Sequence, residues 1–248
     1  VYASDYFAGR DTGSEGQIIA NNFLRDFYKS HGIKSAKGIE DKYFQNFKIM
    51  TKGKLLETAN VAAIIPGSEI PDELVVVSSH LDHLGKKNGK IYNGADDDGS
   101  GTVAMLEIAE AFKLAADQGF PPKRSILFLH MTAEEKGLLG SKYYVDNPLY
   151  PLEKTVANLN IDMIGRIDSY HLNKPNYMYL IGSDILSNDL HLISEEANKK
   201  YVGLQLDYRY NDPSTKVFEF GRWVENNYYY RSDHYNFAMK FLYLKNYY

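Results

Sequence analysis

Apolar side chains recur along the chain with two different periods, which predict alternating helices and strands. Residues 14–29 begin at Ser14 and carry apolar residues at helical spacing until Gly32, so we expect a helix there. Residues 99–113 repeat the helical spacing with a broader apolar face, which predicts a second helix. Shorter apolar or alternating runs predict strands at residues 43–50, 59–65, 73–80, 125–131 and 159–163.

Some of the strand-like runs are too uniformly apolar for half-exposed strands. Residues 75–77 are all valine, and residues 126–129 read Ile-Leu-Phe-Leu, as in parallel strands that are buried on both faces. Strands that alternate with helices imply a mainly parallel (mixed) central sheet with helices on both faces. We therefore predict an α/β fold in a single domain covering residues 1–248. Ligands of such sheets bind at the carboxyl ends of the strands.

Composition narrows the chemistry that this fold can carry. The 248 residues are 44% hydrophobic, enough for a full-sized core, and the net charge of −4 gives no bias toward nucleic acid. The apolar runs fall far short of the ~20 residues of a membrane helix, so we expect a soluble protein. The chain has no cysteine, which excludes disulfides, thiolate zinc sites and a cysteine nucleophile. Any metal must therefore be bound by His, Asp or Glu.

Charged residues stand at the ends of the predicted buried strands, where a side chain can leave the sheet and enter a cleft. The valine-rich strand leads into His80-Leu81-Asp82. Residues two apart in extended backbone share a face, so the Asp82 carboxylate can accept the second ring N–H of His80 and fix the tautomer that binds metal. A surface histidine beside a turn is the competing interpretation, and for the motif in isolation it is the more frequent one.

Three consecutive aspartates, Asp96, Asp97 and Asp98, lie in a glycine-rich turn over residues 93–101. Adjacent carboxylates repel, and a fold tolerates them only in water or around a cation. An exposed acidic helix N-terminus is one alternative. A calcium loop fails, because its twelfth position would fall on Met105 instead of Glu. A phosphate loop also fails, because no Gly-Lys-Ser/Thr follows.

Two further strand ends carry acidic residues. Glu134 and Glu135 directly follow the strand predicted at 125–131. Metal-assisted hydrolysis needs such a pair, one carboxylate to bind the cation and one to move a proton, although a solvated Glu-Glu-Lys loop has the same sequence. Asp162 lies in an apolar strand end, and a lone buried carboxylate is costly unless a cation or Arg166 accompanies it. The common location of these residues favours one shared metal site.

As a set, these motifs resemble metallopeptidase family M28, the zinc aminopeptidases related to bacterial leucine aminopeptidases, glutamate carboxypeptidase and glutaminyl cyclase. The resemblance runs from about Tyr2 to Phe237 and rests on segments 9–14, 80–82, 94–101, 133–141, 160–166 and 232–234. It implies a zinc-exopeptidase (phosphorylase/hydrolase-like) architecture. It also implies a co-catalytic zinc metallo-aminopeptidase that hydrolyses N-terminal amino acids from peptides with a free N-terminus, through a metal-activated water.

The resemblance also implies a role for each site residue. Asp97 would bridge two zinc ions, with His80 and Asp162 on one ion and Glu135 on the other. A cis peptide after the bridging aspartate is frequent in the family, so we expect an unusual bond between Asp97 and Asp98. The catalytic residues would be Glu134, as general base and acid, and Asp82, which orients His80.

The C-terminal part departs from the family pattern. The family's remaining ligand, a histidine on the second zinc, follows the segment that matches Ser232-Asp233-His234, yet no histidine occurs between His234 and Tyr248. We expect either that the chain lacks the family's C-terminal segment or that the second zinc site is incomplete. His234 matches a supporting element and is not expected to bind metal. The remaining histidines carry no separable signal: His31, His83, His171 and His191.

Two other functions stay open besides the peptidase. A glutaminyl cyclase would use one zinc on a related scaffold, and a catalytically impaired protein would retain only a peptide-binding cleft. The Asp96–Asp98 turn resembles the peptidase version. Relatives are commonly exported, so we expect a secreted or periplasmic protein whose signal is not present in this chain.

Overall fold

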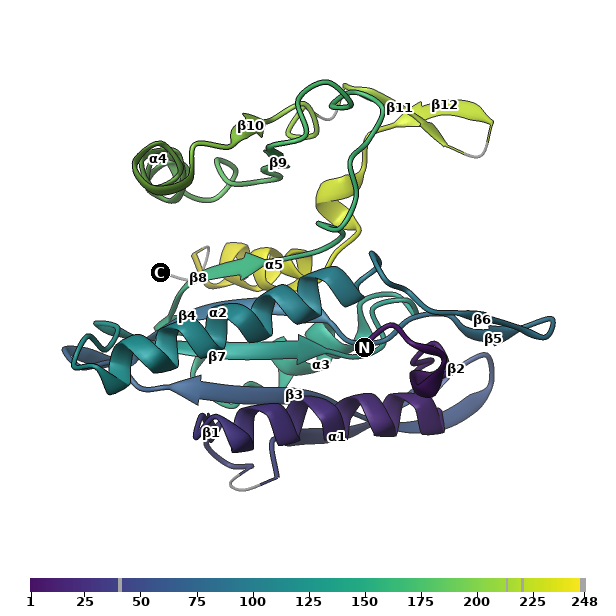
Figure 1. Ribbon diagram of the computed structural model, residues 1–248, viewed down its shortest axis with the longest axis horizontal. Helices are drawn as coiled ribbons and strands as arrows, with labels where there is room; N and C mark the ends of the chain where they lie inside the picture. The colour runs from purple at the N-terminus through teal and green to yellow at the C-terminus, as the bar shows by residue number, and fades with distance from the viewer. Residues whose placement is uncertain (40–41, 213, 220, 246–248) are drawn as a thin grey trace.

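A mixed β-sheet forms the centre of the computed structural model, which describes residues 1–39, 42–212, 214–219 and 221–245 (Figure 1). Within these residues the sheet has the strand order β1-β3-β7-β4-β8, and β2 pairs with β3. The strands are β1 (Lys34–Ser35), β2 (Phe44–Thr51), β3 (Lys54–Ile65), β4 (Ile70–His80), β7 (Arg124–Met131) and β8 (Thr155–Asn160).

The predicted α/β fold with a mixed sheet is confirmed. Strand β4 pairs in parallel with β7 on one side and with β8 on the other, whereas β3 pairs antiparallel with β1, β2 and β7. The valine-rich run therefore lies in the middle of the parallel part, where both of its faces are covered. The carboxyl ends of β4, β7 and β8 consequently meet at one edge of the sheet.

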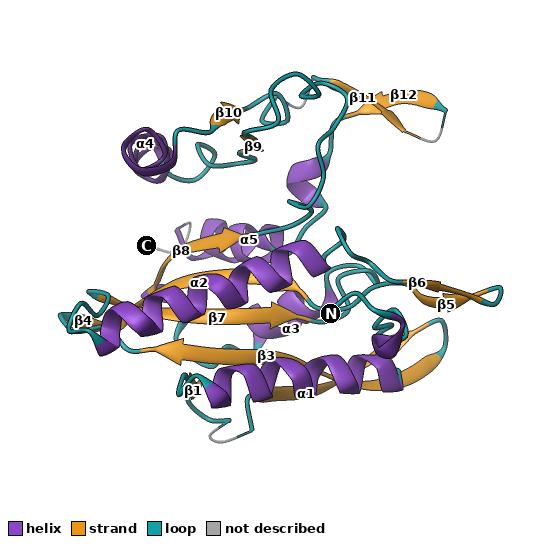
Figure 2. Ribbon diagram, in the orientation of Figure 1, coloured by secondary structure: helices purple, strands orange, loops and turns teal. Residues whose placement is uncertain are grey.

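Helices cover both faces of the sheet (Figure 2). On one face α1 (Glu15–Ser30) and α2 (Gly99–Asp117) pack against Ile126 and Phe128 of β7, and on the other α3 (Leu139–Asp146) and α5 (His234–Lys245) share a core with Leu127 and Leu129. The alternation along β7 follows from the period of two in a strand. Burial of each such side chain stabilises the fold by about 1.5–3 kcal/mol.

The predicted starts of both helices agree with the structure to within one residue, whereas α2 continues to Asp117, beyond the predicted end at residue 113. Helix α1 starts after Ser14, whose side chain accepts a hydrogen bond from the Gln17 amide at 3.3 Å. The strand predicted at 159–163 is present but with other bounds, because β8 covers Thr155–Asn160. Because β8 is an edge strand with half-exposed residues, its own apolar signal is weak, and the stronger apolar signal lies in the loop that follows it.

The remaining elements lie outside the central sheet. A hairpin of β5 (Gly85–Lys87) and β6 (Lys90–Tyr92) follows β4, and the short helical turns are Asp5–Phe7, Leu152–Lys154, Asn198–Val202 and Tyr228–Tyr230. Between β8 and α5 the chain forms a lobe that projects away from the sheet (Figure 1). This lobe contains β9 (Tyr177–Tyr179), α4 (Asn188–Ala197), β10 (Gln205–Asp207), β11 (Lys216–Glu219) and β12 (Arg222–Glu225). None of the described helices has both the length and the apolarity that a membrane crossing requires.

A buried histidine on β7 makes the stability of the fold depend on pH. His130 is fully buried, with its Nε2 2.8 Å from the Tyr28 hydroxyl and its Nδ1 3.2 Å from Ser79 Oγ. Burial lowers the pKa of His130 to about 3. An unfolded histidine titrates near 6.5, so between these two pKa values the unfolded chain binds a proton that the native protein does not, and stability falls as the pH falls.

We expect this histidine to cost about 2 kcal/mol of unfolding free energy between pH 7 and pH 5. Urea unfolding at the two pH values, in wild type and His130→Gln, measures it: the loss on acidification should be smaller in the variant by about that amount. Gln118→Ala at the end of α2 removes no titratable group, so it is the control and should keep the wild-type pH dependence. An equal loss in wild type and His130→Gln would contradict the prediction.

Candidate metal centre and active site

The predicted site residues converge at the carboxyl edge of the three parallel strands. His80 is the last residue of β4, Glu134 and Glu135 follow the end of β7, and Asp162 follows the end of β8. Asp97 reaches the same edge from the loop that precedes α2. The strand register therefore brings together side chains that are far apart in sequence.

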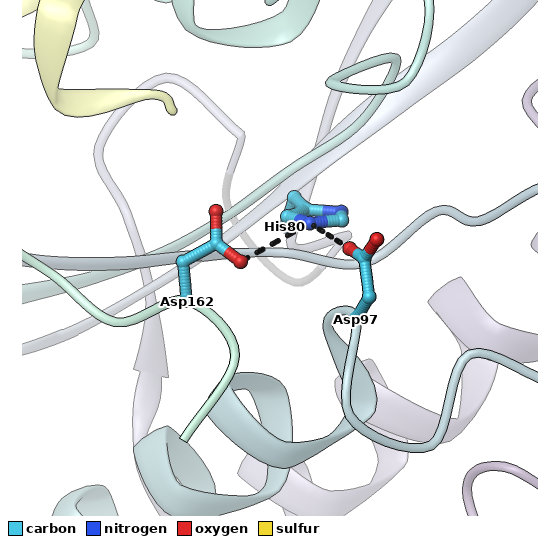
Figure 3. A group of neighbouring side chains, drawn as sticks. All are labelled: His80, Asp97 and Asp162. Carbon is cyan, nitrogen blue, oxygen red and sulfur yellow. Dashed lines mark ion pairs between the residues drawn. The ribbon is translucent and has the colours of Figure 1, made fainter. Parts of the chain in front are cut away.

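His80, Asp97 and Asp162 form a group that fits a metal ion (Figure 3). The Nε2 atom of His80 lies 3.0 Å from Asp97 Oδ1 and 3.8 Å from Asp162 Oδ1. The other Asp162 oxygen accepts a hydrogen bond from Ser232 Oγ at 2.6 Å, whereas Oδ1 is buried with no hydrogen-bond partner in the described part of the chain. A buried carboxylate oxygen without a donor is suited to bind a cation, and one imidazole with carboxylates suits zinc.

The electrostatics of this group also favour a bound cation. Burial disfavours the charged imidazole of His80, yet its hydrogen bond to Asp97 and the nearby carboxylates raise its pKa well above the usual value. Burial also raises the pKa of Asp162. For Asp97, burial works against ionisation, but the hydrogen bond and charge of His80 outweigh it and lower the pKa. The site has an excess of negative charge, which a divalent cation would neutralise.

The three consecutive aspartates point in different directions. Asp96 pairs with Arg166, with 2.7 Å between Oδ2 and Nε, which removes Arg166 as the alternative partner of Asp162. Asp98 is fully buried and accepts hydrogen bonds from the amides of Gly101 (2.9 Å), His80 (3.1 Å) and Met163 (3.2 Å). It thereby joins α2, β4 and the loop after β8. Asp97 alone faces the metal group, and the expected cis peptide between Asp97 and Asp98 is present.

The predicted hydrogen bond from His80 to the Asp82 carboxylate does not form as expected. His80 Nδ1 lies 3.1 Å from the backbone carbonyl oxygen of Asp82 and 3.8 Å from its nearest carboxylate oxygen. The carboxylate is turned away, because it accepts hydrogen bonds from Thr12 Oγ1 (2.9 Å) and from the Glu134 amide (3.1 Å). Residue 82 therefore contacts His80 through its backbone and fixes the Glu134 loop through its side chain.

Glu134 lies beside the metal group without belonging to it. Its Oε2 is 4.0 Å from His80 Nε2, and only 12% of the side chain is exposed. Burial raises the pKa of Glu134 to about 9, and the charges of Asp233 and Asp162 add to that effect. A carboxylate that is held near a metal site but is not used by it can accept a proton.

A second group consists of His83, Asp97 and Glu135. His83 Nδ1 lies 2.8 Å from Glu135 Oε1 and 4.0 Å from Asp97 Oδ2. The structure therefore brings the predicted pair Asp97 and Glu135 together, and it adds His83, which the sequence did not single out. The available signal was its place at the same strand end as His80. His234 belongs to neither group within the described residues.

Arg10 was also not predicted as a site residue, although it matches a family motif. Its guanidinium is fully buried and donates to the carbonyl oxygens of Leu81 (3.0 Å), Tyr2 (3.2 Å), Asn93 (2.7 Å) and Gly94 (2.8 Å). Leu81 adjoins His80, and Gly94 belongs to the turn that carries Asp97. Arg10 thus fixes the two metal-facing segments relative to each other.

Comparisons with known proteins find relatives of this chain. The sequence model of peptidase family M28 matches residues 60–241. Aminopeptidase NAALADL1 from Mus musculus is 37% identical over 112 residues, which are 44% of this chain and 14% of that protein. Leupeptin-inactivating enzyme 1 from Streptomyces exfoliatus is 38% identical over 126 residues, which are 50% of this chain and 25% of that enzyme.

A solved structure extends the similarity to three dimensions. The zinc aminopeptidase BSAP from Bacillus subtilis superimposes with a TM-score of 0.54 at 28% identity, over 75% of this chain and 38% of BSAP. The chain therefore spans well under two thirds of the length of these relatives.

Proposed function

Because the chain belongs to peptidase family M28, we propose that it is a zinc-dependent exopeptidase that hydrolyses N-terminal amino acids from peptides. The observation that carries this proposal is the convergence of His80, Asp97 and Asp162, with Glu134 beside them. Within the described residues, the buried Oδ1 of Asp162 has no hydrogen-bond donor. We place the activity in one catalytic domain, since these residues all come from one edge of one sheet.

The proposed residues divide the work between metal binding and proton transfer. His80, Asp97 and Asp162 hold one zinc ion, and Asp97 with Glu135 holds a second. Zinc, when bound, supplies a water of low pKa and polarises the scissile carbonyl. Glu134 accepts the proton of the attacking water and returns it to the leaving amine, for which its partly enclosed position next to His80 is suited.

The excess negative charge at this edge also suits the proposed substrate. A peptide with a free N-terminus carries an ammonium group, which the ionised carboxylate of Asp97 attracts. An acetylated N-terminus loses that charge. In this proposal the preference for a free N-terminus therefore follows from Asp97, which also binds the metal.

Removal of metal tests the proposal. We expect the zinc-loaded chain to release the amino acid from aminoacyl anilides and peptides with a free N-terminus, and to leave the N-acetylated substrates intact. Dialysis against a chelator should reduce the rate at least ~10²-fold, and added zinc should restore it. Turnover that persists without metal would refute the proposal. Conversion of a Gln-initiated peptide to pyroglutamate without amino-acid release would favour a glutaminyl cyclase instead.

A further inference from the structure

We propose that Lys87 and Lys90 form an anion subsite, which binds a carboxylate in the part of the substrate beyond the cleaved bond. The subsite lies on the hairpin of β5 and β6. The carboxylate is the C-terminal group of a short peptide or the side chain of an acidic residue. The inference rests on the proposed function and deepens it, because it names short and acidic peptides as the preferred substrate class.

The hairpin is inserted between the two segments that carry metal-facing residues. Its first strand begins at Gly85, in the loop that follows His80, and its second strand ends at Tyr92, just before the turn that carries Asp97. Figure 1 shows the hairpin projecting beyond the sheet on the side toward which the arrows of β7 and β8 point. Because both ends of the hairpin join the metal edge, its side chains lie at the border of the site.

The base and the tip of the hairpin are both fixed. At the base, the Gly85 amide donates to the Gly9 carbonyl oxygen at 2.9 Å, and a side chain at Gly9 would collide with the carbonyl oxygen of Tyr92. At the tip, Asn88 and Gly89 both have positive φ angles, 51° and 74°, as in the type I′ turn that sets the register of a two-residue hairpin. The register therefore defines where the lysines of this hairpin stand.

That register places two positive charges directly opposite each other. Lys87 and Lys90 are cross-strand partners, so their side chains share one face of the hairpin. Both are exposed, and neither forms an ion pair with any residue that the structure describes. Like charges at opposed positions destabilise a strand pair. An anion bound between the two ammonium groups would replace this repulsion by attraction.

The surrounding sequence supplies no counter-charge. Residues 83–95 contain three lysines and neither aspartate nor glutamate, although the whole chain has a net charge of −4. The Lys87 ammonium lies 5.8 Å from the centre of the Tyr92 ring, which offers an apolar surface beside the charges. A single charged residue already discourages an exposed strand from pairing with another chain. Protection of the strand edge therefore does not require two facing lysines.

The charges of the hairpin and of the metal edge are opposite, as are those of the two ends of a short peptide. The ionised Asp97 attracts the ammonium group, and the lysines attract a carboxylate. An extended strand rises about 3.4 Å per residue, so Lys87 stands roughly 7 Å beyond Gly85 at the base of the hairpin. A peptide covers that length with only a few residues. The hairpin can therefore contact the product side of a short substrate.

Equilibrium binding tests the subsite without turnover. Calorimetry in the zinc-loaded Glu134→Gln background would compare tetra-alanine with its C-terminal amide, and with the same amide carrying glutamate at its last position. We expect both carboxylate ligands to bind at least about fivefold more tightly than the neutral amide, and high salt should reduce the difference. A preference for only one of them identifies the source of the carboxylate and still supports the subsite.

Variants of the hairpin assign this preference to the lysines. The double variant Lys87→Gln/Lys90→Gln should bind all three ligands equally. Lys90→Glu should also lose the preference while it stabilises the hairpin, because the new carboxylate would pair with Lys87. Lys86→Gln is the matched control: Lys86 neighbours Lys87 in the same strand but points to the opposite face, so the preference should persist.

The outcomes separate this inference from the peptidase proposal. Equal affinities for the three ligands, or an unchanged preference in the folded double variant, would overturn the anion subsite. If the wild type still released amino acids from free-amine peptides, the peptidase proposal would stand. A lysine-dependent preference for carboxylates in a chain that hydrolyses no free-amine peptide would instead refute the peptidase proposal alone.

Discussion

Replacement of Glu134 by glutamine is expected to lower kcat at least ~10²-fold while zinc stays bound. Glutamine keeps the size of the side chain but cannot accept the proton of the attacking water. The Glu134 backbone amide would still donate to Asp82, and neither metal-binding group includes the residue, so the fold and the zinc content should not change. Steady-state kinetics with an aminoacyl anilide and elemental analysis of the same sample measure both effects.

Glu107→Gln on the exposed side of α2 is the matched control and should leave kcat and zinc content at wild-type values. An unchanged kcat in Glu134→Gln would remove Glu134 from the mechanism. Loss of zinc in parallel with loss of rate would instead make Glu134 a metal ligand.

Much of the fold could be predicted because its hydrophobic pattern has a simple physical cause. The uniformly apolar runs of β4 and β7 lie in the parallel, doubly covered part of the sheet, and Ser14 marks the start of α1 through its side-chain hydrogen bond. Parallel strands end at a common edge, so acidic residues placed just after each strand were expected to meet. His80, Asp97 and Asp162 do meet.

The parts of the site that escaped prediction depend on loop geometry. His83 lies in the loop that follows His80. Its ring packs against the turn at Gly94, where any side chain would collide with it, and this packing places the ring next to Glu135. The Asp82 carboxylate turns from His80 toward Thr12, a residue distant in sequence. Arg10 acts on backbone carbonyl groups, which every residue carries. Side-chain patterns contain no signal for such contacts.

The adjacent aspartates show how one motif supports both stability and chemistry. Asp98 is buried where it satisfies three backbone amides, so its carboxylate holds the edge of the sheet together. Asp96 pairs with Arg166, whose side chain is 73% exposed, and an ion pair that is open to solvent on one side contributes about 1 kcal/mol. Asp97 is thereby left as the one carboxylate of the three that faces the imidazole rings of His80 and His83.

Replacement of Asp97 by asparagine is expected to abolish the binding of both zinc ions at concentrations that saturate the wild type. Asp97 is the only residue common to the two donor groups in the described part of the chain, so its loss removes a charged ligand from each. We expect affinity to fall by more than ~10² at both positions, beyond the usual effect of residues that only support a metal ligand. Chelator competition measures the affinities, and hydrolysis of an aminoacyl anilide should fall below detection.

The neighbouring aspartate supplies a control with the same substitution in the same turn. Asp96→Asn should bind two zinc ions with wild-type affinity, because its side chain contacts Arg166 and the Gly165 amide instead of the metal group. A matched unfolding measurement should find both variants folded, since neither change touches the amides that Asp98 satisfies. If Asp96→Asn lost zinc as completely as Asp97→Asn, general disruption of the turn would explain the result and the bridging role of Asp97 would be wrong.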